Sequence, residues 1–210
     1  MSGIHLALLG MSFGGLPAIG GAFGGGFFAG EISTAGNGIA DYNLVIAPKS
    51  SGENSSKEWK TSLTSTAGTT SVIDGPTNSS NMNNASHPAA EFCEGLTIGG
   101  FSDWYLPAKN ELEVCYFNLK PTTTSNDTGS GTNTNAVPSR GSNYTAGTPA
   151  QTVATDFQTG NAQAFIATLY WSSTQFDGAF AIPQNFSNGD QNIATKTLAV
   201  YVRAVRRVAV

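Results

Sequence analysis

The chain has 210 residues, a net charge of −4 and a charged fraction of 11%, well below the roughly 25% of ordinary soluble domains. With only 10 Lys and Arg residues, it lacks the basic stripe that binds phosphates, which excludes nucleic acid as an expected partner. No apolar run approaches the roughly 18 residues of a membrane span, so we expect no membrane insertion. A surface of Ser, Thr, Asn and Gly with so few charges is typical of virion and secreted proteins, and it favours burial in an oligomer.

The N-terminal region combines a short apolar run with a glycine-rich stretch. No positive region precedes the apolar run, so the sequence predicts no signal peptide and synthesis in a host cytoplasm. Glycine and phenylalanine alternate over 20–28, which predicts irregular strands rather than a helix. We interpret residues 1–60 as an attachment and oligomerisation segment and residues 61–210 as one domain. The Gly-x-Ser-x-Gly pattern at 10–14 is interpreted as chance, because the following glycines prevent the helix that a nucleophile elbow needs.

Further along, residues 27–48 predict two strands joined by a Gly36-Asn37-Gly38 turn. The stretches 50–60 and 61–82 are rich in polar and turn-forming residues, and predict ordered loops. Strands are expected again near the C-terminus, with an Asn-Gly hairpin turn at 187–190. These C-terminal strands are expected at 164–174, 178–186, 191–194 and 198–208.

Two amphipathic helices are expected, over 86–96 with Ser86 as N-cap and over 108–119 after Pro107. Each has apolar residues at helical spacing along one face. The two faces are expected to pack against one another. They consist of Ala89, Phe92, Cys93 and Leu96 in the first helix, and of Ala108, Leu112, Cys115, Tyr116 and Leu119 in the second.

The two cysteines, Cys93 and Cys115, lie on these predicted inward faces. We interpret them as buried free thiols, because free cysteine is among the most buried residue types. A disulfide between them is the second interpretation. A catalytic pair is the third, and it is disfavoured because His87 does not stand at helical-neighbour spacing to Cys93 and nothing else activates either thiol.

Metal and catalytic sites find little support in the sequence. Zinc is not expected, because the only histidines are His5 and His87 and no Cys-x-x-Cys occurs. We expect no cofactor and no enzymatic activity. A glycosidase would need paired carboxylates such as Asp103 with Glu111, whereas Glu111 and Glu113 point to different helix faces. Three loop acids are interpreted as solvated turn residues, with ion binding as the alternative: Asp127, Asp177 and Asp190.

The stretch 121–149 is a long insertion, and such loops are usually functional or mobile. Arg140 and Tyr144 are its only large side chains. Together with Phe157 in the loop 154–162, we select them as ligand contacts, because exposed aromatic residues give contact area at little entropic cost and arginine adds directional hydrogen bonds. Such exposure predicts that Arg140→Ala combined with Tyr144→Ala weakens binding and leaves melting unchanged.

Three separated signatures occur in order: Gly-Gly-Phe-Ser-Asp-Trp-Tyr-Leu-Pro at 99–107 with Glu-Leu at 111–112, Tyr-Trp-Ser-Ser-Thr at 170–174, and Val-Arg-Ala-Val-Arg-Arg at 202–207. Together they resemble the Lcl C-terminal-type domain, a C-type-lectin-like family of bacterial surface proteins and of bacteriophage tail fibres and receptor-binding proteins. The resemblance covers roughly residues 85–208.

The resemblance implies an α+β, C-type-lectin-like fold with two short helices, a mixed sheet and long loops, preceded here by the Gly/Phe-rich segment. The matching hallmark positions imply core residues rather than sugar platforms, and Arg203 is expected to pair with an acid such as Glu111. These hallmark residues are Trp104, Leu106, Pro107, Glu111, Leu112, Trp171 and Arg203.

The first hypothesis for function is a non-enzymatic bacteriophage virion protein, a tail-fibre or tail-tip module that binds a host surface glycan or protein. Residues 1–60 would attach it to other virion proteins, and fibre architecture suggests a homotrimer. The alternative is a structural capsid or tail decoration protein whose partner is the virion. A bacterial surface adhesin is a distant third hypothesis, which the expected lack of a signal peptide disfavours.

Overall fold

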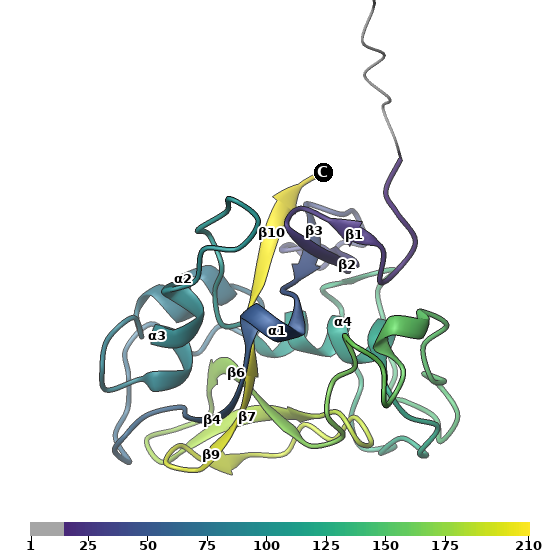
Figure 1. Ribbon diagram of the computed structural model, residues 1–210. Helices are drawn as coiled ribbons and strands as arrows, with labels where there is room; N and C mark the ends of the chain where they lie inside the picture. The colour runs from purple at the N-terminus through teal and green to yellow at the C-terminus, as the bar shows by residue number, and fades with distance from the viewer. Residues whose placement is uncertain (1–14) are drawn as a thin grey trace, which may run out of the picture.

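The computed structural model describes residues 15–210, which form an α+β fold with two curled sheets and short helices (Figure 1). The Gly10–Gly14 pattern and His5 lie outside these residues. The elements in chain order are β1 (Ala22–Phe23), β2 (Gly26–Ile32), β3 (Tyr42–Ile46), α1 (Lys49–Gly52), β4 (Glu53–Glu58), α2 (Gly75–Ser80), α3 (Pro88–Glu94), α4 (Lys109–Leu119), β5 (Ala136–Val137), the 3-10 helix η1 (Thr155–Phe157), β6 (Leu169–Gln175), β7 (Phe180–Asn185), β8 (Ala194–Thr195), β9 (Ala199–Arg203) and β10 (Val205–Ala209).

The first sheet joins the two ends of the described chain. Its strand order is β1-β2-β3-β10, and β5 pairs with the other part of β2. β2 and β3 form the predicted antiparallel pair on either side of the glycine-rich turn, with a bulge between Phe28 and Gly30. β10 then pairs antiparallel with β3, from Val205 opposite Ile46 to Ala209 opposite Tyr42. The C-terminal strand therefore completes a sheet that begins near the N-terminus.

The second sheet has the order β4-β9-β6-β7-β8. Its pairs are antiparallel except β6 with β9, which run parallel with Tyr170 opposite Tyr201. Ala204 lies between β9 and β10, where the chain passes from the second sheet to the first. Its N–H donates to the Gly52 carbonyl, and its own carbonyl accepts from the Ala47 N–H, both at 3.0 Å. These bonds satisfy the backbone where it leaves one ladder for the other.

α4 lies between the two sheets, and the core divides around it (Figure 1). The predicted stripe of α4 is buried, and Leu112, Cys115 and Leu119 belong to a cluster with residues of β2, β3 and β6. A second cluster gathers around three fully or almost fully buried tryptophans, Trp59, Trp104 and Trp171. Both hallmark tryptophans therefore lie in the core, as predicted.

Two stretches predicted as loops contain regular structure. Residues 50–60 hold the end of α1 and all of β4, and the adjoining Trp59 is fully buried. Residues 61–82 hold α2, which begins after Asp74; the side chain of Asp74 accepts a hydrogen bond from the Thr77 N–H at 3.2 Å. An aspartate cap followed by proline in the first turn is a recognised helix start. The helix could therefore have been predicted from Asp74 and Pro76, despite the many Ser, Thr and Asn residues around them.

The predicted packing of the two helix faces on each other is wrong. Cys93 of α3 belongs to the tryptophan cluster, whereas Cys115 of α4 belongs to the other cluster. α3 packs instead on α2, β4 and β9. Both cysteines are buried and free, as the first interpretation predicted. Burial raises the pKa of each thiol far above its usual range, so neither is an activated nucleophile.

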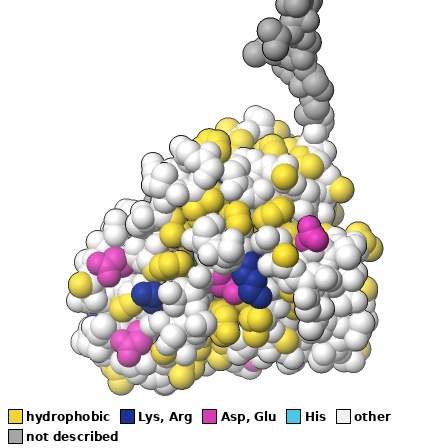
Figure 2. Space-filling view, in the orientation of Figure 1, with side chains coloured by type: hydrophobic (Ala, Val, Ile, Leu, Met, Phe, Trp, Pro, Cys, Tyr) yellow, Lys and Arg dark blue, Asp and Glu magenta, His cyan; other side chains and the backbone are white. Residues whose placement is uncertain are grey.

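Each sheet contains strands from both sides of residue 60, because β3 pairs with β10 and β4 pairs with β9. The attachment role of residues 1–60 stays a prediction. Among residues 15–210, no helix has the length and apolar character needed to cross a bilayer. The face shown in Figure 2 carries only a few charged side chains, as the low charged fraction predicts.

Candidate functional site

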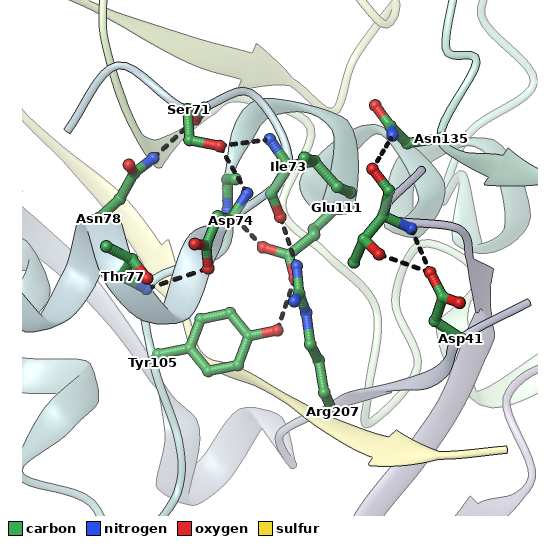
Figure 3. Close-up of polar contacts among 12 residues, drawn as sticks. Asp41, Ser71, Ile73, Asp74, Thr77, Asn78, Tyr105, Glu111, Asn135 and Arg207 are labelled. Atoms are coloured by element: carbon green, nitrogen blue, oxygen red, sulfur yellow. Dashed lines mark hydrogen bonds and ion pairs between the residues drawn. The ribbon is translucent and has the colours of Figure 1, made fainter. Parts of the chain in front are cut away.

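The buried carboxylate of Glu111 ties α4 to both the 99–107 stretch and β10. Tyr105 OH donates to Glu111 Oε1 at 2.6 Å, and Arg207 Nε donates to the same oxygen at 2.8 Å, as Figure 3 shows. The Ala108 N–H donates to Oε2 at 2.7 Å. Burial raises the pKa of the Glu111 carboxyl, while the Arg207 charge and these hydrogen bonds oppose the rise. With every partner inside the protein, Glu111 holds the fold together.

The other hallmark side chains are also buried. Trp104 Nε1 donates to the Phe101 carbonyl at 3.1 Å, and Trp171 Nε1 donates to the carbonyls of Lys57 and Leu198 at 3.1 and 3.2 Å. Neither ring offers a face to a ligand. The buried hallmark residues are Trp104, Leu106, Pro107, Glu111, Leu112, Trp171 and Arg203.

Arg203 pairs with an acid, as expected, but this acid is Glu53 and not Glu111. Arg203 ends β9 directly opposite Glu53 of β4, and its guanidinium lies 3.8 Å from the Glu53 carboxylate. It also donates to the carbonyls of Ala47 and Gln163 at 2.9 and 2.7 Å. Burial is the main cause that lowers the pKa of Arg203 to about 10. Arg207 follows Ala204, where the chain passes to the first sheet, and it is Arg207 that pairs with Glu111 of α4.

The predicted ligand contacts are not exposed as a group. Phe157 is fully buried and packs edge-on against Phe27, with ring centroids 5.5 Å apart. Tyr144 is 5% exposed, and its hydroxyl donates to Glu113 Oε1 at 2.7 Å. Arg140 is partly exposed, and its guanidinium forms an ion pair with the fully buried Glu113. Burial therefore removes the basis on which Tyr144 and Phe157 were selected.

Buried asparagines anchor the 121–149 loop to the rest of the fold. Asn133 Nδ2 donates to the Asn110 carbonyl of α4 at 2.8 Å and also to Glu113. Asn135 Nδ2 donates to the Ser33 carbonyl beyond β2 at 2.8 Å. Asn126 accepts from both Tyr116 OH and Lys120 Nζ. Because buried amides satisfied on several sides fix a backbone in one position, the loop is a firm support for its exposed residues.

A polar pocket of about 390 Å³ opens between this loop and the 187–192 turn. Ser130 joins its two walls: its hydroxyl donates to Asp127 Oδ2 at 2.8 Å and accepts from the Gln191 N–H at 3.1 Å. The predicted turn at 187–190 connects the antiparallel strands β7 and β8, and it carries Asp190 into the pocket wall. The polar pocket is lined by Lys109, Asp127, Gly129, Ser130, Gly131, Thr132, Asn143, Asp190, Gln191 and Asn192.

An aromatic pocket of about 380 Å³ adjoins the polar pocket, and Asn143 lines both. Phe117 forms its partly exposed aromatic wall, with the guanidinium carbon of Arg140 4.0 Å from the ring centroid. The aromatic pocket is lined by Phe117, Arg140, Gly141, Ser142, Asn143, Tyr144, Thr145 and Thr148. The structure thus places Arg140 and Tyr144 at one pocket, with Tyr144 as a buried support.

Sequence reasoning noted Asp127 and Asp190 only as loop acids and missed Lys109 as a lining residue. These three come from distant parts of the chain, so no local spacing links them. Asp177, the third loop acid, lies elsewhere and caps its own turn through the N–H groups of Ala179 and Phe180. Across residues 15–210, no three His, Cys, Asp or Glu side chains gather as a metal site.

His87 is a buried histidine outside the pockets. Its Nδ1 pairs with Asn84 Oδ1 at 2.9 Å and its Nε2 with Thr66 Oγ1 at 2.8 Å. Burial, followed by the charges of Lys60 and Lys196, lowers its pKa to about 4. The ring is therefore neutral in the folded protein at pH values where an exposed histidine is protonated.

This lowered pKa predicts a loss of stability on acidification. Between about pH 6.5 and pH 4 the unfolded chain binds a proton at His87 that the folded protein does not, so the free energy of unfolding falls as pH falls through this window. Melting temperatures measured from pH 7 to 4 test this. His87→Gln, which keeps a polar group at the position, should flatten that part of the profile; an equal slope in both proteins would contradict the assignment.

Comparison with known protein families gives a match over most of the chain. No curated protein matches the chain. The family model described as the Lcl C-terminal domain matches residues 53–206, more than half of the chain. The match begins at β4 and ends within β10. It includes the first two signatures, the third signature except its last residue, Arg207, and the residues that line the two pockets. The chain therefore belongs to the Lcl C-terminal domain family.

Proposed function

We propose that this chain is a receptor-recognition module of a bacteriophage tail fibre or tail tip, and that it binds a host surface glycan or protein through the polar and aromatic pockets. The observation that carries the proposal is the pair of adjoining pockets that share Asn143 on one firmly anchored loop. Ligand sites are commonly concave regions with a few well-placed polar groups on a rigid support. Both pockets are concave, contain a few polar groups and are lined largely by the 121–149 loop.

We propose further that the fold is C-type-lectin-like. The pairing of β10 with the β2–β3 hairpin supports this, because it closes the domain on itself and leaves long loops to be packed against the body. In such a scaffold the buried hallmark residues maintain the fold and the loops carry recognition. Fold alone does not set the ligand, so the proposal for binding rests on the pockets.

The carboxylates paired with arginines are not placed for catalysis, which favours a binding role for this fold over an enzymatic one. The carboxylates of Glu53, Glu111 and Glu113 form ion pairs with arginines, and Asp103 accepts two hydrogen bonds from Arg206. A general acid or base must reach a substrate proton. These carboxylates instead form hydrogen bonds and ion pairs that connect strands, loops and α4 within the fold.

Virion attachment through residues 1–60 and assembly as a homotrimer complete the proposal, and size measurement by light scattering tests the trimer. The main experiment is adsorption. The purified chain should bind bacterial cells and should block adsorption of the particle that carries it. Asn143→Ala, at the shared edge of the pockets, should weaken both effects, whereas Glu91→Gln, at an exposed position of α3, should not. Protein that binds only virions lacking it, and leaves adsorption unchanged, would support the decoration alternative and refute receptor recognition.

A further inference from the structure

The polar pocket presents hydrogen-bonding atoms that the described protein does not use. Asp127 employs Oδ2 for Ser130, which leaves Oδ1 available. Asp190 employs Oδ1 for Asn192, which leaves Oδ2 available. Lys109 Nζ makes no hydrogen bond or ion pair with residues 15–210, although its side chain is partly buried in the pocket wall. One strong donor and two strong acceptors therefore line the same hollow.

This mixture suits hydroxyl groups. A hydroxyl both donates and accepts, an ionised carboxylate only accepts and an ammonium only donates. Neighbouring hydroxyls on a sugar ring can therefore donate to the free oxygens of Asp127 and Asp190 while accepting from Lys109. Such bonds to charged groups are stronger than those between neutral groups.

The charges around the pockets disfavour an anionic ligand. In the polar pocket, the one positive charge of Lys109 faces the two negative charges of Asp127 and Asp190. In the aromatic pocket, the positive charge of Arg140 is already compensated by Glu113. A carboxylate, sulfate or phosphate on the ligand would thus meet a net negative site, and such juxtaposition is costly.

The aromatic pocket offers the complementary apolar wall. Phe117 is partly exposed there, and the flat Arg140 guanidinium lies over its ring. A sugar ring has C–H groups on its faces and hydroxyls on its edges, so a ligand spanning both pockets can place an apolar face against the exposed part of Phe117 that the Arg140 guanidinium does not cover. Each volume lies near the lower end of the about 300–1,000 Å³ range of small-molecule sites, which suits a short oligosaccharide across the two.

We propose that the two pockets form one site for an uncharged oligosaccharide, in which neighbouring hydroxyls of one sugar are held by Lys109, Asp127 and Asp190 and the adjoining sugar lies against Phe117. This inference rests on the proposed function and specifies its ligand. It assigns recognition to the sugar's hydroxyl pattern and excludes acidic or sulfated sugars as the preferred class.

The test uses the full chain and a bacterial strain that it binds in the adsorption experiment. Mild periodate cleaves bonds between carbons bearing neighbouring hydroxyls, and borohydride then removes the aldehydes formed. Cells treated in this way should lose binding. Neutral hexoses and deoxyhexoses added in excess should compete with untreated cells, whereas glucuronate and dextran sulfate at equal concentration should not.

Two variants connect this behaviour to the polar pocket. Asp190→Asn keeps an oxygen for the Asn192 contacts but removes the charge, and Lys109→Gln removes the ammonium. Each should weaken binding to cells about ten-fold or more, because a lost hydrogen bond to a charged group has an effect of at least that size. Glu91→Gln removes the same charge as Asp190→Asn at an exposed position of α3, and it should bind like the wild type. Equal melting temperatures verify that all variants fold.

The outcomes separate the two proposals. If the chain binds cells but periodate leaves binding intact, if acidic or sulfated sugars are the effective competitors, or if both variants bind like the wild type, the oligosaccharide site is refuted and receptor recognition stands. If no strain is bound and adsorption is unaffected, receptor recognition fails and the ligand assignment fails with it.

Discussion

Replacing Glu111 by leucine is expected to lower the free energy of unfolding by about 3–5 kcal/mol, the usual loss when one partner of a buried ion pair is removed. The leucine fills a similar volume, so the loss comes from the groups left behind. Arg207 would keep a charge without its carboxylate, and the Tyr105 hydroxyl and the Ala108 N–H would lose their acceptor. Urea denaturation followed by circular dichroism measures the change.

The double variant Glu111→Leu with Arg207→Met is the informative control. Replacing both partners of a buried pair by apolar groups removes the uncompensated charge. We therefore expect the double variant to be more stable than Glu111→Leu alone by about 1 kcal/mol or more, although Tyr105 and Ala108 still lack their acceptor. If the loss of unfolding free energy in the double variant equalled the sum of the losses in the two single variants, Glu111 and Arg207 would not be coupled and the prediction would be wrong.

Tyr144→Ala is expected to destabilise the protein by about 3–5 kcal/mol, the range for truncating a large buried aromatic side chain. Its ring packs beside Tyr116, with centroids 5.5 Å apart, and lies against Gly131 and Gly189, which have positive φ and no space for a Cβ. The truncation would leave a cavity beneath both walls of the polar pocket. It would also leave Glu113 Oε1 without its hydroxyl donor.

Two neighbouring changes set the scale for this prediction. Tyr144→Phe keeps the ring and loses only the hydrogen bond, so a smaller loss of about 1.5–3 kcal/mol is expected. Asn143→Ala changes an exposed residue and should stay within about 0.5 kcal/mol of the wild type. If Tyr144→Ala melted at the wild-type temperature, the original interpretation of Tyr144 as an exposed contact would be restored and its burial contradicted.

Local patterns predicted the elements whose signals lie within a few residues. The apolar spacing of Leu112, Cys115 and Leu119 predicted α4 and its buried face, and the glycine turn at 36–38 predicted the β2–β3 pair. The signatures predicted the family that the match over 53–206 shows. In these cases the residues that determine the element lie within the element itself or in the turn beside it.

Long-range partners were beyond such patterns. Two arginines only four positions apart, Arg203 and Arg207, pair with different glutamates because the chain changes sheets at Ala204 between them. Nothing in the local sequence marks that crossover. The same reason explains the misplaced face of α3, whose apolar spacing fixes which side is buried but not which element covers it.

The candidate site shows the same division. The sequence predicts a long loop at 121–149, and Arg140 of this loop lies at the aromatic pocket. The burial of Tyr144 could not be read from the sequence, because it depends on Glu113 in α4 and on two glycines in separate segments. Likewise, Asp127, Asp190 and Lys109 meet only once the fold brings a loop, a turn and a helix start together.

The asparagine anchors of the 121–149 loop give this protein a practical use as a library scaffold. Asn126, Asn133 and Asn135 are buried, whereas 141–143 and 145–148 are exposed on either side of the buried Tyr144. Randomising only those exposed positions leaves the anchors intact, so a display library built there would vary the contact surface at little expense to folding. Variants with new binding specificities could therefore be selected from substitutions at 141–143 and 145–148, while the buried asparagines stay unchanged.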